Sequence, residues 1–240
     1  MTSTPTVWKP AGDAVEQRLG PLVATLHRAG PAPRLEVTAA TGRRDDLLGL
    51  DLRAAAQPAD EWLRGCDAVA IYEPDDPRRL RATAMWRIAA AAPGASGAWE
   101  LVVSAQTSLL ESDASLTVTS EVHGDELLAA EWPAGGAGLA WRPVTGRRGP
   151  AATTGCLLVR RRDDATSVLV AVHPGDARGL AASSAGGRVR IACALFRSQV
   201  EKGVLLRGRV LAAIGPAAGD EAWAAAVATA FAASPPVLET

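Results

Sequence analysis

The chain has 240 residues, of which 48% are hydrophobic and 21% charged, and its net charge at pH 7 is −1. These values fit one globular domain over residues 1–240. They exclude recognition of nucleic acid or acidic membranes through a basic surplus. The three cysteines occur singly, which favours free thiols and a cytoplasmic protein. The N-terminus resembles no secretory signal, and no apolar stretch reaches the ~20 residues of a membrane span.

Residues 13–29 have the hydrophobic spacing of a helix. Apolar side chains recur at intervals of three and four residues, at Val15, Leu19, Leu22 and Leu26. Such spacing places them on one helical face, and the Gly-Pro pair at residues 30–31 supplies a stop signal. The sequence therefore predicts a helical segment within residues 1–33.

From residue 34 onward the hydrophobic period changes to two, which indicates β-strands. Residues 80–88 are the clearest case, because apolar residues form one face and Arg81, Thr83, Met85 and Arg87 form the other. Strands are predicted at residues 34–39, 48–53, 67–73, 80–88, 99–107, 116–123, 126–132, 139–142, 155–162, 167–173, 188–196 and 203–214.

A second helix is predicted over residues 220–233. Asp220 is expected to cap its N-terminus, and an apolar stripe that includes Trp223, Val227 and Phe231 follows. No alternation of strands and helices occurs between residues 34 and 214, which argues against a parallel α/β fold. The expected fold is all-β and mostly antiparallel, a large β-sandwich or supersandwich of about a dozen strands with short N- and C-terminal helices.

No motif of an established chemistry occurs in the sequence. Residues 135–138, Gly-Gly-Ala-Gly, lack the lysine and the following helix of a phosphate-binding loop. We interpret them as part of an irregular loop over residues 133–150. Two prolines interrupt the acidic group Glu73, Asp75 and Asp76, which favours a turn over a cation site. No cofactor and no metal are expected.

Several predicted strands carry charged side chains opposite their apolar face. Arg87 lies on one strand, Glu100 on the next, and Arg207 and Arg209 on the last. If these strands adjoin in one sheet, their planar guanidinium groups form a surface suited to hydroxyl-rich or anionic ligands. The alternative is the solvated outer face that antiparallel sheets commonly have.

His173, His123 and Glu201 are the candidate acid/base residues. Each histidine ends a predicted strand beside a turn, where an imidazole can reach a pocket and transfer protons near neutral pH. Glu201 shares strand parity with Arg207 and Arg209, which makes it a candidate base among arginines. The alternatives are histidines bonded to turn backbone and a surface salt-bridge cluster.

Trp132 and Trp141 flank the glycine-rich loop. Exposed indoles at these positions would stack on the apolar faces of sugar rings. Alternatively, both residues anchor the loop to the body of the protein.

Four segments carry a resemblance to an uncharacterised bacterial β-sandwich family. They are residues 72–87, Ser104-Ala-Gln-Thr107, Val172-His-Pro174 and residues 201–209, Glu-Lys-Gly-Val-Leu-Leu-Arg-Gly-Arg. More loosely, the architecture is similar to the galactose-mutarotase-like supersandwich. That resemblance implies a concave sheet face that binds sugars, with histidines and a carboxylate as acid/base groups in the enzymes of the fold. It transfers no catalytic residue, because no motif matches.

Two functions follow from these patterns. The first is a carbohydrate-binding or carbohydrate-active protein, of epimerase or lyase kind, whose ligand is a sugar or sugar acid. His173, His123 and Glu201 would transfer protons and Arg87, Arg207 and Arg209 would hold the ligand, which requires them to converge in one pocket. The second is a non-enzymatic interaction or scaffold domain with a protein partner or a second copy, contacted at Trp132 and Trp141.

Overall fold

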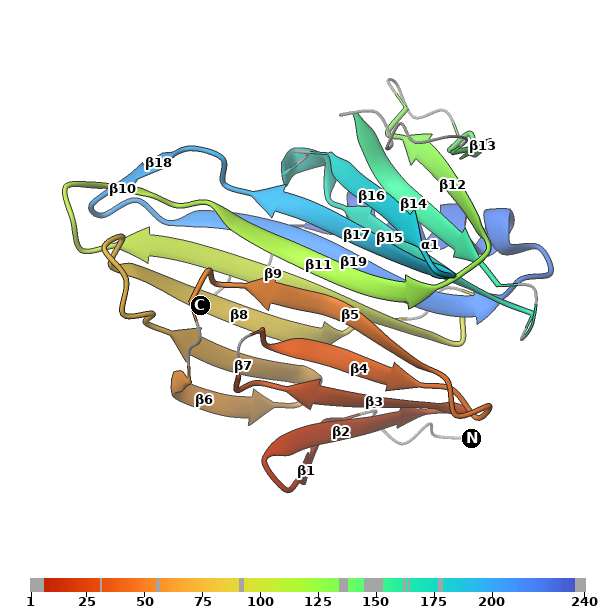
Figure 1. Cartoon of the computed structure of the whole chain (residues 1–240), viewed down its shortest axis with the longest axis horizontal. Helices are drawn as coiled ribbons and strands as arrows, with labels where there is room; N and C mark the ends of the chain where they lie inside the picture. Colours follow the sequence, from red (N-terminus) through yellow and green to blue (C-terminus); the bar gives the residue numbers. More distant parts are fainter. Residues whose placement is uncertain are drawn as a thin grey trace.

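The structure is a computed structural model that describes residues 7–30, 32–54, 57–90, 93–133, 138–144, 153–161, 163, 165–176 and 179–235. Within these residues the strands form two large antiparallel sheets and one two-stranded ribbon. We call the sheet that contains the N-terminal strands sheet 1 and the other large sheet sheet 2. Sheet 1 lies in front of sheet 2 in Figure 1, and the ribbon projects at the left. The prediction of an antiparallel β-sandwich is confirmed.

Sheet 1 contains both N-terminal strands and strands from the second half of the chain. Its order is β1 (Lys9–Ala11), β2 (Ala14–Leu19), β3 (Leu22–His27), β4 (Arg34–Thr38), β5 (Arg44–Asp51), β11 (Leu116–His123), β17 (Arg188–Leu195) and β16 (Leu180–Ala185). Neighbouring strands are antiparallel throughout.

Sheet 2 is the larger sheet. Its order is β13 (Arg142–Pro143), β12 (Glu126–Glu131), β14 (Thr154–Arg160), β15 (Thr166–Val172), β19 (Leu206–Pro216), β9 (Gly97–Thr107), β8 (Leu80–Ile88), β7 (Asp67–Tyr72) and β6 (Pro58–Arg64). The ribbon pairs β10 (Glu111–Asp113) with β18 (Gln199–Glu201). The last strand of the chain, β19, therefore lies in the interior of sheet 2.

The predicted N-terminal helix is wrong, because residues 14–27 form the hairpin of β2 and β3. Gly20 turns the chain with a φ of 54°, a conformation that glycine adopts without strain. Gln17 occupies a buried position on β2, where its side-chain oxygen accepts a hydrogen bond from Trp99 Nε1 at 2.9 Å. This buried polar residue breaks the apolar alternation that would have identified the strand.

The inner faces of the two sheets enclose one apolar core. Trp86 of β8 and Trp99 of β9 are fully buried in it, as the period of two predicts. The indole Nε1 of Trp86 donates to the carbonyl of Leu48 at 3.1 Å. Because Leu48 belongs to β5, this bond joins sheet 2 to sheet 1 while satisfying a buried donor.

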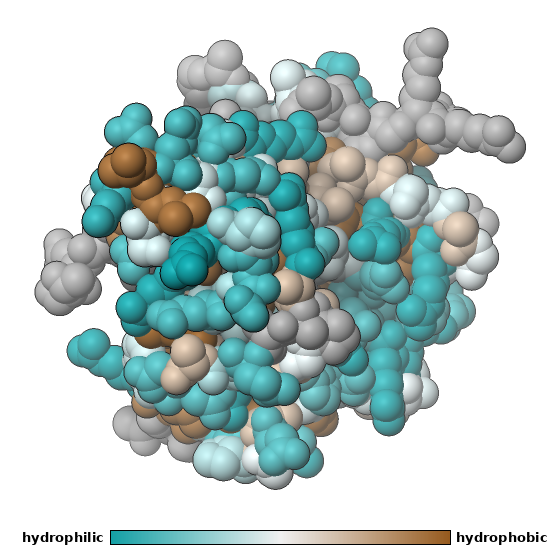
Figure 2. Space-filling view, turned by 60° about the vertical axis from the view of Figure 1, so that its left-hand side comes forward, coloured by the Kyte–Doolittle hydropathy of each residue, from teal (hydrophilic) through white to brown (hydrophobic). Residues whose placement is uncertain are grey.

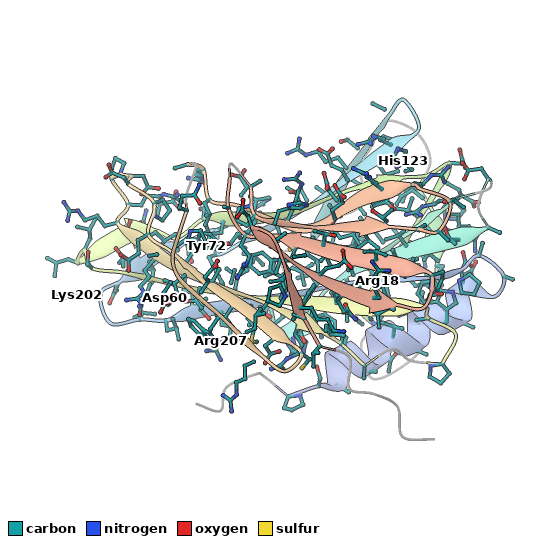
Figure 3. All side chains as sticks on the ribbon, turned by 90° about the horizontal axis from the view of Figure 1, so that it is seen from below. Arg18, Asp60, Tyr72, His123, Lys202 and Arg207 are labelled. Atoms are coloured by element: carbon teal, nitrogen blue, oxygen red, sulfur yellow. The ribbon has the colours of Figure 1, made fainter. Side chains whose placement is uncertain are left out.

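Helix α1 (Asp220–Ala233) packs on the outer side of sheet 2, below the strands in Figure 3. Its bounds confirm the prediction, but Asp220 is not the cap. Gly219 occupies the N-cap position, and the buried Asp220 carboxylate instead accepts hydrogen bonds from Arg160 and Ser167. Within the described residues, α1 falls short of the length and apolarity of a membrane-spanning helix.

Candidate functional site

Four strands of sheet 2 present polar side chains on the side that faces away from the sandwich core. We call this side of β7, β8, β9 and β19 the open face. Antiparallel partners point to the same side of a sheet, so the strand register arranges the open face in rows. From the end near α1 outward, the rows are Asp67–Arg87–Glu100, Val69–Met85–Val102–Arg209, Ile71–Thr83–Ser104–Arg207 and Arg81–Gln106.

The charged side chains in the two rows nearest α1 form ion pairs with one another. The guanidinium of Arg87 donates two parallel hydrogen bonds to the carboxylate of Asp67, at 2.7 and 2.9 Å. Arg209 and Glu100 are both buried, and Arg209 Nε donates to Glu100 Oε1 at 2.5 Å. Bidentate and buried arginine–carboxylate pairs are strong and fix the orientation of both side chains. Arg87 and Arg209 are therefore already satisfied by the protein, which leaves them little capacity for a ligand.

Arg209 also fastens the end of α1 to the sheet. Its guanidinium donates to the carbonyls of Ser234 and Pro235, at 3.1 and 3.2 Å, and to Ser234 Oγ at 2.6 Å. The same group lies 5.1 Å from the ring centroid of Phe231. A cation here satisfies carbonyls at the helix C-terminus and complements the helix dipole. Helix α1 consequently closes this side of the open face.

His173 lies in the same enclosed corner, next to Arg209 across the β15–β19 pair. Its Nδ1 accepts a hydrogen bond from the Gly175 backbone N–H at 3.2 Å, so the turn alternative applies to this atom. Burial lowers the pKa of His173 below its usual 6.5, and the charge of Arg209 acts in the same direction. Asp176, whose pKa burial raises, lies 4.0 Å from Nδ1.

The two outer rows are more accessible. Thr83, Ser104 and Arg207 are half-buried, and Arg81 and Gln106 are exposed. Arg207 Nε donates to Ser104 Oγ at 3.2 Å. Hydroxyl, amide and guanidinium groups thus lie side by side in the two outer rows of the open face, which α1 does not cover.

A pocket of about 980 Å³ continues from the outermost row. We call it the β7–β8 pocket, since the loop between these strands forms one wall, the end of β9 another and the turn after β18 a third. Its lining is Glu73, Pro74, Asp75, Asp76, Pro77, Arg79, Leu80, Arg81, Gln106, Thr107, Ser108, Lys202 and Gly203. The end of the molecule that carries β10 and β18 has a mostly hydrophilic surface (Figure 2).

The sequence did not point to Arg79 and Lys202, although both line this pocket. The prolines of residues 73–77 identified a turn, and the turn is present, but its neighbourhood depends on strand order. The pocket exists because β8 lies between β7 and β9 and the β18–β19 turn reaches the same end. No local sequence pattern predicts that these strand ends and this turn lie next to one another.

The two candidate histidines are not brought together. His123 ends β11 in sheet 1 and shares a face with Glu121, which pairs with Arg188 and Arg190 of β17. His173 shares a face of sheet 2 with residues that pack under α1. Figure 3 shows His123 at the opposite end of the molecule from Lys202 and on the opposite side from Arg207.

His123 instead belongs to a buried connection between the sheets. Its Nδ1 lies 3.2 Å from Oδ1 of Asp45, and its backbone N–H donates to the same oxygen at 2.9 Å. Arg161, which follows β14 of sheet 2, forms an ion pair with the other oxygen of Asp45. Both charged side chains of that pair are almost fully buried. The arrangement gives His123 a structural partner.

The remaining candidates lie apart from the histidines. Glu201 is exposed on β18 opposite Glu111, adjacent in sequence to Lys202 but outside the pocket lining. Trp132 Nε1 donates to the carbonyl of Val172 at 3.0 Å, and Trp141 Nε1 to that of Glu221 at 3.2 Å. Both indoles therefore anchor to the body, while residues 134–137 and 145–150 of the loop between and after them lie outside the described residues.

Within the part of the chain that the structure describes, no group of three His, Cys, Asp or Glu side chains is placed to hold a metal ion. The acidic residues of the β7–β8 pocket are engaged differently. Glu73 lies 3.4 Å from Arg81, and Asp76 lies 2.6 Å from Arg78.

Two stacked antiparallel sheets form a large β-sandwich with polar side chains on the outer side of the larger sheet, in agreement with the sandwich architecture that the sequence resemblance implied. The structure is similar to that of the Slr1438 protein from Synechocystis sp. PCC 6803, with a TM-score of 0.58, 8% identity, and coverage of 90% of this chain and 99% of that one. At this identity the likeness concerns the fold alone.

A GalM/aldose epimerase homologue from C. elegans gives a TM-score of 0.49 at 8% identity, with 81% of this chain and 96% of that chain covered. Nothing further rests on that likeness. No family model and no curated protein matches the chain. The resemblance to an uncharacterised bacterial β-sandwich family therefore stays a prediction.

Proposed function

We propose that this protein binds carbohydrate, and that the ligand occupies the β7–β8 pocket together with the adjoining rows of the open face. The observation that carries the proposal is the lining of the pocket. Carboxylate, guanidinium, ammonium, amide and hydroxyl groups surround about 980 Å³ of space. A hydroxyl-rich ligand offers donors and acceptors in every direction, so it can satisfy such a mixed lining where an apolar ligand cannot.

The adjoining rows extend the same chemistry. Gln106 presents both a donor and an acceptor, and Arg81 presents a planar fork. Thr83 and Ser104 add hydroxyl groups one row further along. The proposal covers binding only. The acid/base roles of His173, His123 and Glu201 stay predictions, since these residues do not meet in the pocket.

A thermal-shift screen against neutral sugars and uronic acids tests the proposal. A sugar at about 100 times its Kd adds about 2.7 kcal/mol to the free energy of unfolding, which raises the Tm by about 5 to 10 °C for a chain of this size. The shift should be lost in Arg81→Ala and in Gln106→Ala.

Arg190→Ala is the matched control. Arg190 is also an exposed strand arginine beside a glutamate, but it lies on sheet 1 and faces away from the pocket. A shift that survives Arg81→Ala, or that Arg190→Ala abolishes equally, would contradict the proposed site. A screen in which no sugar shifts the Tm would contradict the function.

One observation favours the second candidate function, a protein-interaction domain. Leu110, Val204 and Leu205 are exposed by 86%, 42% and 52%. Lys202 N–H donates to the Leu110 carbonyl, so these residues lie near one another at the end of the ribbon. Native mass spectrometry of the wild type and of Leu110→Ser with Leu205→Ser tests whether this apolar area supports an oligomer.

A further inference from the structure

We infer that the ligand is an acidic oligosaccharide of at least three sugar units, with one anionic group held between Arg79 and Lys202. This inference rests on the proposed carbohydrate-binding function and assigns its ligand class. Three features of the β7–β8 pocket support it: the balance of charge, the backbone conformation of Arg79 and the length of the accessible surface.

The charge balance follows from which lining residues already have partners. Glu73 pairs with Arg81 at 3.4 Å. Asp76 pairs with Arg78 at 2.6 Å, and this pair is largely buried. These contacts offset two of the three acidic groups in the lining.

Three charged side chains of the lining have no ion-pair partner among the described residues. Two are cationic, Arg79 and Lys202, and one is anionic, Asp75. The pocket therefore keeps a positive surplus. A carboxylate or another anionic group on the ligand would offset this surplus of one positive charge, whereas a neutral sugar would leave it in place.

Arg79 is held in a strained conformation. Its φ is 45°, in the left-handed region that residues with a side chain rarely adopt. The surrounding turn enforces it, because Arg79 N–H donates to the Asp76 carbonyl at 3.1 Å. Thr107 and Ser112 both donate their hydroxyls to the carbonyl of Arg78, at 3.1 and 2.8 Å. Strain kept in place by neighbouring groups is typical of functional positions.

The length follows from the spacing of the rows. Residues two apart on a strand lie about 6.6 Å from each other, which leaves room for one sugar ring per row. The accessible surface offers three such positions: the row of Thr83 and Ser104, the row of Arg81 and Gln106, and the far end of the pocket at Arg79. A pocket of about 980 Å³ is at the top of the range of about 300–1,000 Å³ for drug-sized ligands, so a single ring would leave most of it empty.

Calorimetric titration with galacturonic acid and its di-, tri- and tetramers tests the inference, with maltose, maltotriose and maltotetraose as neutral counterparts and glucose 6-phosphate as a compact anionic sugar. Affinity should rise at least about tenfold from the acidic monomer to the trimer. Lys202→Gln should lower the affinity of the trimer about fivefold to tenfold and should have little effect on maltotriose.

Arg79→Gly gives a second readout that a merely structural role would not produce. Glycine adopts this φ freely, so the variant should raise the Tm by about 2 to 4 °C while weakening trimer binding. Arg53→Gly is the matched control. Arg53 also has a positive φ, 62°, but lies outside the pocket lining, so its replacement should leave binding unchanged.

The inference is overturned if the acidic monomer or glucose 6-phosphate binds as tightly as the trimer, if maltotriose matches trigalacturonate, or if Lys202→Gln and Arg79→Gly keep full affinity. In those cases the proposed carbohydrate binding still stands. If no sugar of either series binds, the proposed function fails and the inference fails with it.

Discussion

The imidazole of His173 meets the ring of Phe231 edge to face, with centroids 5.3 Å apart and planes inclined at 86°. Phe231 also contacts the guanidinium of Arg209. A proton on His173 would therefore place a second positive charge beside Arg209, under the last turns of α1. The nearby carboxylates are Asp176, 4.0 Å from Nδ1, and Glu100, which is already bonded to Arg209.

This contact predicts a pH-dependent stability. The pKa of His173 lies below its usual 6.5 in the folded protein, so the unfolded chain binds the proton more readily. Neutral His173 therefore contributes fully to the free energy of unfolding above about pH 6.5. This contribution is lost as the pH falls from there toward the pKa of His173 in the folded protein. His173→Asn, which keeps an acceptor for Gly175 N–H, should flatten the decline of the Tm between about pH 7.5 and about pH 5. His27→Gln, on a half-exposed strand position, should leave the decline as it is, and an unchanged slope in His173→Asn would refute the assignment.

The buried pair of Asp45 and Arg161 predicts a large loss of stability when its carboxylate is removed. Asp45→Asn takes away the counter-charge of a buried guanidinium, which costs about 3 to 5 kcal/mol in the free energy of unfolding. Chemical denaturation measures this loss. Asp46→Asn is the control, since Asp46 is only half-buried beside Arg34 and its replacement should change the free energy of unfolding by less than about 1 kcal/mol. Similar losses in the two variants would show that Asp45 is no more important than a surface residue.

The anchorage of α1 at Asp220 gives a second test of the fold. Asp220 accepts bonds from Arg160 at 2.7 and 2.8 Å and from Ser167 at 2.7 Å. Asp220→Ala leaves those donors without their acceptor and should cost about 2 to 3 kcal/mol. Glu221→Gln alters a more exposed partner of the same arginine and should cost less than about 1 kcal/mol. Comparing the Tm of Asp220→Ala with that of Glu221→Gln tests this difference. A loss in Glu221→Gln as large as that in Asp220→Ala would contradict the anchoring role of Asp220.

The packing of Trp132 on Gly155 predicts a steric effect. A Cβ on Gly155 would lie 2.3 Å from the indole Nε1 of Trp132, so Gly155→Ala must displace the ring and break its bond to the Val172 carbonyl. We expect a loss of about 1 to 3 kcal/mol and a shifted indole N–H resonance in NMR spectra. Gly138→Ala has nothing within 4 Å of the new methyl group and should change neither. An undisturbed indole signal in Gly155→Ala would show that the ring packs elsewhere.

Local patterns in the sequence predicted most of the strands of the core and the helix of residues 220–233, but not β2, β3 and β16. The apolar and polar faces of β8 follow directly from its alternation. The N-terminal hairpin was missed because Val15, Leu19, Leu22 and Leu26 satisfy both a helical spacing and, with the turn at Gly20, two short strands. For strands of this length, tertiary pairing decides between the two periods.

The candidate site was only partly predictable. Strand parity put Arg81 with Arg87 and Arg207 with Arg209, and the register of β8, β9 and β19 then places all four on one face of sheet 2. It could not show that Arg87 and Arg209 already have buried or bidentate carboxylate partners, because Asp67 and Glu100 come from other strands. Arg79 lines the pocket from a turn whose Arg78 carbonyl accepts bonds from Thr107 and Ser112, far along the chain, so no local pattern could show its position.

The position of β19 in sheet 2 has a consequence for synthesis on the ribosome. Its neighbours β9 and β15 end at residues 107 and 172, whereas β19 ends at residue 216. Until that last strand leaves the exit tunnel, the nascent chain holds two unpaired strand edges that flank the place β19 will take. Sheet 2 is therefore completed only after residues 206–216 have been synthesised, and a chain truncated before residue 206 would expose both edges to other molecules.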